Sequence, residues 1–331
     1  MSGEDIPYQL RPNKFIDRQM FVELLSRLVV PRGPEKYVYV SMGGRHLVDH
    51  YAVYNKLGID AQFSFDRDAN EVKRQKFNRP TGRTICVELS TADLPSRIDD
   101  ILKEFPNRQN LIVWLDYTDT NRGAQLQEAV QTLLRLKHGD IFRITLNANP
   151  ETLSPGEQWR NAGASSPNQY RATRLRGQIQ EFMPTDISAI SETALPAALA
   201  RCVELAAKSA EAQQPNLRIK PVLITSYRDG SRMLTVTCAI SEAGNKNKFP
   251  PITFPRWRFA CKNWQDIRLI YAPVLSVREQ NRLDARLHRG ASDMLAALKF
   301  YPNKDKPKSL EALKSYRELH RFYPTFRHVE D

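Results

Sequence analysis

The chain has 331 residues, 41% of them hydrophobic, and a formal net charge of +12. This length suffices for one large domain or two medium ones, and the composition is that of a globular protein with a sizeable core. No apolar run approaches the roughly 18 residues of a membrane-spanning helix. The N-terminus also lacks the apolar segment of a signal peptide, so we expect a cytoplasmic protein without a membrane partner. The positive charge favours anionic partners such as nucleic acid or phosphorylated ligands, or else belongs to a soluble protein that happens to be basic.

The first half of the chain alternates between helical and strand patterns. Apolar residues between Phe15 and Leu28 recur at three- and four-residue steps, which predicts an amphipathic helix that ends before Pro31. Short apolar or β-rich runs predict five strands, at 37–41, 61–65, 84–89, 111–115 and 140–146. Helical patterns separate them, at 47–57, 71–77, 94–105 and 124–136. Such alternation implies βαβ units, and therefore a mostly parallel sheet with right-handed crossovers.

The second half begins with a polar segment, from Asn147 to about Thr185, which interrupts this alternation. A strong helix follows at 194–212, and β-rich runs at 222–227 and 233–240 flank an Asp-Gly turn, which predicts a β-hairpin. The last ninety residues or so have a Lys-, Asn- and Pro-rich connector at 242–255, an aromatic and basic stretch at 257–269, and helical patterns at 276–298 and 309–322. We therefore expect a Rossmann-like domain at 1–241 with a basic insertion at about 150–185, and a C-terminal extension at 242–331 packed on it.

The four cysteines lie far apart in the sequence and form no CxxC pair. They are Cys86, Cys202, Cys238 and Cys261. This spacing suggests neither a disulfide framework nor a zinc ribbon. Reduced, mostly structural cysteines are the simplest expectation for a cytosolic protein.

Five alternating strands, a helix and a β-hairpin, in this order, resemble the class I S-adenosylmethionine-dependent methyltransferases over roughly residues 14–240. In that family the hairpin adds an antiparallel strand to the edge of a Rossmann-like three-layer sandwich, which distinguishes it from dehydrogenases. The chain is also similar to poorly characterised bacterial O-methyltransferases, some of them encoded near phage-defence genes. The resemblance implies an α/β fold and S-adenosylmethionine as the cofactor.

The residues at the strand ends also resemble that family. The run from Ser41 to Gly44, which includes Gly43, stands where the glycine-rich first motif follows strand one. Asp66 stands where an acidic residue holds the ribose hydroxyls, and Asp93 stands near the position of the adenine. Physical chemistry supports these roles, because ligands of open α/β sheets bind outside the carboxyl ends of the strands, glycine lets the backbone approach a ligand, and a carboxylate can accept two hydroxyl hydrogen bonds.

The glycine motif departs from the family pattern in two ways. It lacks the acidic residue before the glycines and the third glycine after them, and Arg45 and His46 follow Gly44 instead. Gly43 and Gly44 could therefore form only a tight turn before a helix. Arg45 could crowd the amino-acid end of the donor or could pair with its carboxylate.

The run from Asp116 to Asp119, after strand four, occupies the catalytic position of the family. In amino-methyltransferases a polar residue here aligns the target amine with the methyl group, and an aromatic neighbour, here Tyr117, can stack on a flat substrate. In O-methyltransferases an Asp here would act as a base or help to bind an ion. The two prolines of the amino-methyltransferase motif are missing. Alternatively, Asp116 caps a strand-to-helix loop and Asp119 is solvated.

His46, Asp49 and His50 form an HxxDH pattern on the second helix. The spacing of the two histidines can hold zinc, but no third ligand is evident nearby, so we expect no metal site. Asp49 could instead face the cleft and contact the amino group of the donor.

Two basic stretches could bind an acceptor. The first lies in the insertion, at the mouth of the expected cleft, and carries Arg160, Arg171, Arg174 and Arg176. Guanidinium groups contact phosphates, although this segment could also be a mobile, solvated loop. The second is 246–262, whose aromatic residues could stack on unpaired bases. It could equally be a core strand, with Trp257 and Phe259 on one face and Arg256 and Arg258 on the other.

The sequence thus supports methyl transfer from S-adenosylmethionine to a nucleic acid or another anionic acceptor. The incomplete glycine motif motivates an alternative, in which a catalytically silent methyltransferase fold binds nucleic acid or a protein partner, as a subunit of a bacterial anti-phage system. A nicotinamide-dependent oxidoreductase is disfavoured by the missing GxGxxG motif and by the terminal hairpin.

Overall fold

The computed structural model describes residues 11–251 and 254–324, which form two compact units. Of the described residues, the larger unit contains 21–226, 231–251 and 254–268, and the smaller contains 11–20, 227–230 and 269–324. The division therefore differs from the expected boundary at 241. Residues 242–251 and 254–268 belong with the larger unit, whereas residues 11–20 and the tip of the hairpin belong with the smaller one.

The larger unit is built on a sheet whose strand order is β3-β2-β1-β4-β5-β7-β6-β8. The first five strands are parallel, and β7 pairs with β5 in the antiparallel direction. The strands are β1 (Tyr37–Ser41), β2 (Gln62–Asp66), β3 (Thr84–Glu88), β4 (Asn110–Asp116), β5 (Ile141–Asn147), β6 (Leu217–Asp229), β7 (Ser231–Glu242) and β8 (Arg268–Leu269). The expected mostly parallel sheet with a C-terminal hairpin is confirmed. The turn between β6 and β7 is made by Gly230, which has a φ of +101°.

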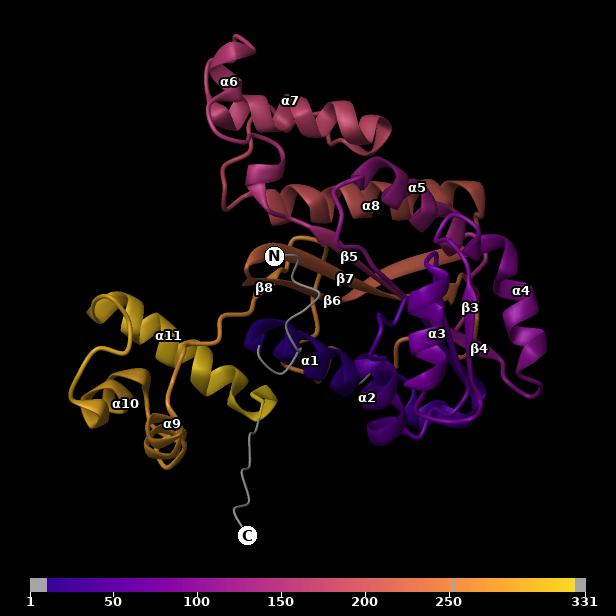
Figure 1. The fold of residues 1–331 in the computed structure, drawn as a ribbon, viewed down its shortest axis with the longest axis horizontal. Coiled ribbons are helices and arrows are strands. Elements are labelled where there is room, and N and C mark those ends of the chain that lie inside the picture. Colours follow the sequence, from indigo (N-terminus) through magenta and orange to yellow (C-terminus); the bar gives the residue numbers. More distant parts are fainter. Residues whose placement is uncertain (1–10, 252–253, 325–331) are drawn as a thin grey trace. The chain divides into compact units, whose positions relative to one another are not determined.

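Helices cover both faces of this sheet (Figure 1). They are α1 (Pro12–Leu28), α2 (Val48–Leu57), α3 (Ala69–Phe77), α4 (Leu94–Glu104), α5 (Arg122–Leu133) and α8 (Leu195–Gln213). On one face, alternate residues of the strands such as Val40 and Leu115 join one apolar cluster with α4, α5 and α8. On the other face, Trp114 packs edge-to-face on Phe21, with ring centroids 5.3 Å apart. Because successive strand residues point to opposite faces, the fully buried strands need apolar side chains at nearly every position.

The insertion after β5 is helical, which the sequence did not indicate. It contains the short helix α6 (Gln158–Asn161) and the longer α7 (Pro167–Ile179), which packs on α5. Arg122, which is fully buried, fixes it: the guanidinium donates to the carbonyl of Asn147 and to the side chains of Thr152 and Gln178. Burial lowers the pKa of Arg122 to about 10. The alternative of a mobile, solvated loop does not fit these hydrogen bonds to a buried guanidinium.

The aromatic stretch near Trp257 is part of the larger unit, but it does not form the strand that we considered for it. The chain forms a short 3-10 helix (Phe254–Arg256) followed by turns. The expected alternation of side chains is nevertheless present, because Trp257 and Phe259 are buried while Arg256 and Arg258 are exposed. The indole of Trp257 donates to Glu23, at 3.0 Å.

The smaller unit contains α9 (Val277–Asp284), α10 (Ala291–Leu298) and α11 (Lys306–Leu319). The single helix expected at 276–298 is broken before Gly290, the N-cap of α10. Asp229, at the tip of the hairpin, caps α1, since its carboxylate accepts hydrogen bonds from the backbone amides of Asn13 and Lys14. Within the described ranges, no helix is long and apolar enough to cross a membrane.

Candidate functional site

The carboxyl ends of β3, β2, β1 and β4 form one edge of the parallel sheet. Ser41 of β1 pairs with Ser64 of β2 and with Trp114 of β4, and Asp66 pairs with Glu88 of β3. Asp66 and Asp116 lie two residues beyond Ser64 and Trp114, the partners of Ser41, so Glu88, Asp66, the loop that follows Ser41, and Asp116 form a row along this edge. Neighbouring strands lie about 4.8 Å apart, so this row is about 14 Å long. It crosses the switch in strand order between β1 and β4, where ligands of such sheets bind.

The glycine loop follows β1 and leads into α2. Gly43 and Gly44 both have left-handed backbone, with φ of +67° and +57°. A Cβ atom on Gly43 would lie 2.5 Å from Leu47 Cδ2, 2.7 Å from Ser64 Oγ and 2.8 Å from His50 Cε1. Gly43 is therefore required by the packing of the protein on itself. Gly44 is exposed, so it is the glycine whose backbone a ligand can approach.

An acidic side chain lies at the end of β1, although the strand itself contains none. Asp49 of α2 is only 5% exposed, and its Oδ2 accepts hydrogen bonds from Tyr39 and Ser41, both at 3.1 Å. The hydroxyl of Ser41 also accepts a hydrogen bond from the backbone amide of Gly43. Ser41, expected to bind the cofactor, therefore supports the loop from inside. The expectation that Asp49 would face the cleft does not fit its burial.

Side chains of α3 hold the glycine loop on its other side. Gln75, which is fully buried, donates to the carbonyl of Met42, and Asn78 donates to the carbonyl of Arg45. The guanidinium of Arg45 forms an ion pair with Glu71, at 3.3 Å. Arg45 is thus directed to α3, which leaves the approach to Gly44 less crowded than the sequence implied.

Asp66 ends β2 with its carboxylate partly exposed. One oxygen accepts a hydrogen bond from the backbone amide of Asp68, at 2.9 Å. Within the described part of the chain, no hydrogen bond reaches the second oxygen. Asp68 caps α3, since it accepts from the amides of Asn70 and Glu71, and this cap fixes the direction in which the chain leaves Asp66.

Asp93 lies beyond β3, at the start of α4, and is exposed. Its carboxylate accepts a hydrogen bond from the hydroxyl of Ser90, at 2.6 Å. Ser90 follows β3 by two residues, so Asp93 belongs to the β3 end of the row, next to Asp66. Gly44, Asp66 and Asp93 thus lie at or beyond the carboxyl ends of β1, β2 and β3, three neighbouring strands of the sheet.

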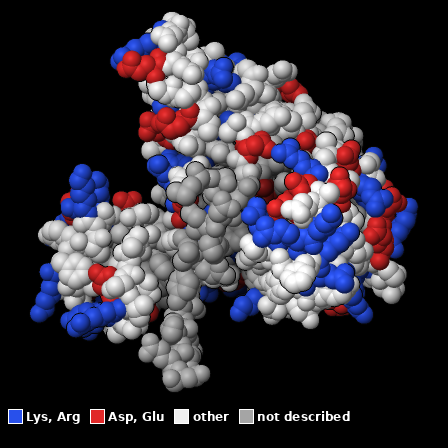
Figure 2. All heavy atoms as spheres, in the orientation of Figure 1, with Lys and Arg blue, Asp and Glu red and all other residues white. Residues whose placement is uncertain are grey.

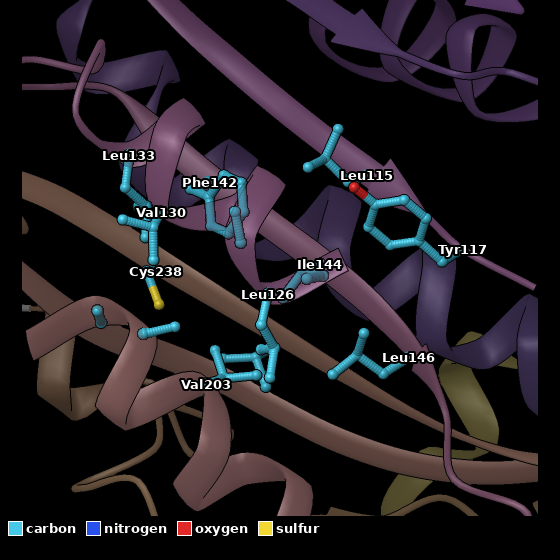
Figure 3. Close-up of a cluster of buried hydrophobic side chains, with 14 of the residues drawn as sticks. Leu115, Tyr117, Leu126, Val130, Leu133, Phe142, Ile144, Leu146, Val203 and Cys238 are labelled. Carbon is cyan, nitrogen blue, oxygen red and sulfur yellow. The ribbon is translucent and has the colours of Figure 1, made fainter. Parts of the chain in front are cut away.

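Asp116 and Tyr117 point in different directions. Asp116, the last residue of β4, is partly exposed at the switch in strand order. Tyr117 is only 4% exposed, its ring lies in the core cluster with Leu115 and Leu126 (Figure 3), and its hydroxyl donates to Glu128. Burial and the Glu128 carboxylate strongly raise the pKa of Tyr117. A ring with this placement cannot stack on an acceptor, so the role expected for Tyr117 is not retained.

The four arginines of the insertion have different surroundings. Arg171 is only 5% exposed, bonds to Asn168 and forms an ion pair with Glu192, so a role in acceptor binding does not fit it. Arg160 forms an ion pair with Glu157. Arg174 and Arg176 are exposed, and Arg176 donates to the carbonyl of Ile187.

The two histidines of the HxxDH pattern are separated by burial. His46 is exposed in the turn before α2, whereas His50 is fully buried and packs edge-to-face on the ring of Tyr39. Burial lowers the pKa of His50, so the ring is neutral at physiological pH. No cluster of three metal-ligating side chains occurs in the residues that the structure describes.

The residues at this edge fit the ribose and adenine of S-adenosylmethionine. A ribose offers two hydroxyl donors, and Asp66 has a partly exposed carboxylate with one oxygen not otherwise engaged. The same edge offers the exposed backbone of Gly44 and the exposed carboxylate of Asp93.

A strand order in which β3-β2-β1-β4-β5 is followed by a β7-β6 hairpin is that of the methyltransferase fold. The chain belongs to a family described as "Putative O-methyltransferase", whose model matches residues 6–331. No curated protein matches the sequence.

Solved structures with some similarity include several methyltransferases. A SAM-dependent methyltransferase from Anabaena variabilis is 9% identical, with 71% of this chain and 96% of that chain covered and a TM-score of 0.34. A DUF574 family protein from Streptomyces avermitilis is 13% identical, with coverages of 68% and 83% and a TM-score of 0.38. Trm1 from Pyrococcus horikoshii, in complex with S-adenosyl-L-methionine, is 13% identical, with coverages of 68% and 54% and a TM-score of 0.42.

Proposed function

We propose that this protein transfers the methyl group of S-adenosylmethionine to an anionic acceptor, of which a nucleic acid is the leading candidate. One observation carries the proposal: the strand register places Asp66 and Asp116 on either side of the loop that follows Ser41, at the switch in strand order, in a chain of a methyltransferase family. An open α/β sheet binds its ligand at that point.

The donor would lie along the β1–β3 end of the row. Asp66 would accept hydrogen bonds from the ribose hydroxyls, Asp93 would lie beside the adenine, and the backbone of Gly44 would face the amino-acid part. A bound S-adenosylmethionine supplies a methyl group on a sulfonium, which is already activated for transfer. The interior contacts of Ser41 and Gly43 would hold the loop in the shape that the donor needs.

The acceptor would approach from the β4 side. Asp116 would accept a hydrogen bond from the O–H or N–H group to be methylated, would direct a lone pair of that atom toward the methyl group, and would accept the proton that the group loses. Such alignment is the main requirement of a direct displacement. A net charge of +12 raises the local concentration of anionic acceptors.

Calorimetry with S-adenosylmethionine or its demethylated product tests the donor site. Asp66→Asn keeps an oxygen for the Asp68 amide but removes the charge, and a charge-assisted hydrogen bond is worth about 1.5–3 kcal/mol, so we expect affinity to fall about tenfold or more. Asp99→Asn, an equal change of charge at an exposed position of α4, should bind as the parent does. No binding at millimolar donor would contradict the proposal.

The packing around Gly43 favours a second candidate. Because the inner side of Gly43 is filled by Leu47, Ser64 and His50, the loop has no space there for a ligand. A protein that binds nucleic acid without transferring methyl groups would show salt-dependent binding to DNA or RNA and no affinity for the donor.

A further inference from the structure

The outer surface of α3 carries a group of exposed cations around one exposed aromatic ring. We name this group the α3 basic face, and it consists of Arg67, Lys73, Lys76, Phe77 and Arg79, all exposed. Figure 2 shows Lys and Arg side chains gathered over the part of the surface where Figure 1 has α3. The face begins directly after Asp66 of the donor site.

Helix geometry explains why these side chains lie together. Val72 and Gln75 are buried toward the sheet. Residues three and four apart share one side of a helix, so Lys73, Lys76 and Phe77 lie on the opposite, outer side. Arg79 continues the face just past the end of α3.

The carboxylates close to this face are already engaged. Asp68 caps α3, Glu71 pairs with Arg45 and Arg74, and Asp60 pairs with Arg83 and Arg108. The four cations of the face form no ion pair within 4.0 Å among residues 11–251 and 254–324. The face is therefore open to an anionic ligand.

Phe77 distinguishes this face from a merely solvated charged helix. Its ring is 90% exposed, more than any other aromatic side chain described. An aromatic ring among lysines and arginines is the combination that binds single-stranded nucleic acid, since the cations contact phosphates and the ring stacks on an unpaired base. A base-paired duplex offers no base face for such stacking.

We propose that the α3 basic face binds a single-stranded nucleic acid, with Lys73, Lys76 and Arg79 on phosphates and Phe77 stacked on a base. The idea that this nucleic acid is the methyl acceptor rests on the function proposed above, because a nucleic-acid strand on this face would lead to Asp66 and the donor site. The binding of nucleic acid itself can be tested in the absence of S-adenosylmethionine.

An anionic membrane is a less suitable partner for this surface. A helix that lies in a membrane interface needs an apolar face of several residues. On α3 the large apolar residues are Val72, which is buried, and Phe77. One exposed ring on a nine-residue helix provides too little apolar surface.

The test is fluorescence anisotropy with labelled single-stranded RNA and DNA of about a dozen nucleotides, the upper range of a site of this kind. The variant Lys73→Glu with Lys76→Glu should weaken binding about tenfold or more and reduce the salt dependence. Phe77→Ala should weaken it about fivefold or more, and Phe77→Trp should restore it. Arg174→Glu with Arg176→Glu on α7 changes the net charge equally and should weaken binding by less than about threefold.

Three results would overturn the proposal: unchanged binding by the α3 variants, an equal loss in the α7 variant, or binding to phosphatidylserine vesicles that depends on Phe77 while the oligonucleotides do not bind. The circular dichroism of each variant confirms that it is folded. The anisotropy assay contains no S-adenosylmethionine, so a negative result there would not contradict the donor site that calorimetry tests. A negative result in calorimetry would likewise not contradict the binding of nucleic acid to the α3 basic face.

Discussion

At the scale of single residues, Gly43 shows how strongly the loop after β1 is specified. Two requirements coincide there: a left-handed backbone, and no room for a Cβ atom beside Leu47, Ser64 and His50. Gly58, which ends α2, has a similar φ of +71° but open space around it. Alanine at Gly58 would therefore introduce backbone strain alone, whereas alanine at Gly43 would introduce both strain and overpacking.

Gly58→Ala should lower the free energy of unfolding by about 1 kcal/mol, the cost of left-handed backbone for a residue with a Cβ atom. Gly43→Ala adds overpacking and should cost about 2–4 kcal/mol in total. Chemical denaturation of both variants checks this. Equal losses would show that the packing around Gly43 yields readily.

Asp140 offers a test of pH dependence. It is fully buried, and burial raises its pKa from 3.8 to about 6, opposed by hydrogen bonds from Lys137, Asn110 and Leu111. Between these two pH values the unfolded chain has lost the proton while the folded chain retains it. The contribution of Asp140 to stability is therefore greatest below about pH 4 and falls by about 2–3 kcal/mol as the pH rises to about 6.

Asp140→Asn should remove this component of the pH dependence. Free energies of unfolding at pH 4 and pH 7, compared between the variant and the parent, cancel the contributions of other groups such as His50. The variant should also lose about 1–3 kcal/mol at pH 4, since an amide offers one acceptor oxygen where the carboxyl group serves several donors. The same difference between pH 4 and pH 7 in both proteins would contradict the assignment.

At the scale of elements, α7 depends on a close approach to α5. A Cβ atom on Gly123 would collide with the backbone carbonyl of Gln178, whereas Gly177 of α7 has open space around it. Gly123→Ala should cost about 1–3 kcal/mol and should accelerate hydrogen exchange in α7. Gly177→Ala should be neutral or stabilising by up to about 1 kcal/mol. If the amide hydrogens of α7 exchange at the same rate in both variants, the contact with Gly123 does not stabilise α7.

The order of the elements could be predicted because it depends on local apolar periodicity, which is strong in β4, α4 and α8. α7 was missed because its outward residues are polar and part of its buried side is Arg171, which hides the helical period. Its start did carry a signal, since Ser166 accepts a hydrogen bond from Gln169 and Pro167 follows at the first position. In the segment near Trp257, buried aromatic and exposed basic side chains alternate as they would in a strand, yet the backbone forms turns.

The candidate site could be predicted only in part, for a similar reason. Asp66 and Asp116 directly follow predicted strands, so their place at the sheet edge follows from the topology alone. The direction of Tyr117 depends on Glu128, eleven residues away, and the support of Ser41 depends on Asp49 of another element. Such contacts arise from tertiary packing, which one sequence does not reveal.

At the scale of the whole molecule, all four cysteines are free and buried. Burial raises the pKa of Cys86 to about 11 and those of Cys202 and Cys261 to about 12, and it raises the pKa of Cys238 well above its usual value. Since the thiolate is the reactive form, a shift from 9 to about 11 alone slows modification about a hundredfold.

A disulfide reagent should therefore modify the native protein slowly and should modify all four thiols once guanidinium has unfolded it. Absorbance at neutral pH follows both reactions. A thiol that reacts in the native protein at the rate of a free cysteine would show that its surroundings open easily.

The chain passes between its two units four times, at 20/21, 226/227, 230/231 and 268/269. Neither unit is a continuous stretch of sequence. Asp229, at the tip of the β6–β7 hairpin, caps α1, which begins near the N-terminus. A gene encoding residues 1–241 would omit 242–268 from the larger unit and the three C-terminal helices from the smaller one. A single cut in the chain therefore cannot separate the two units.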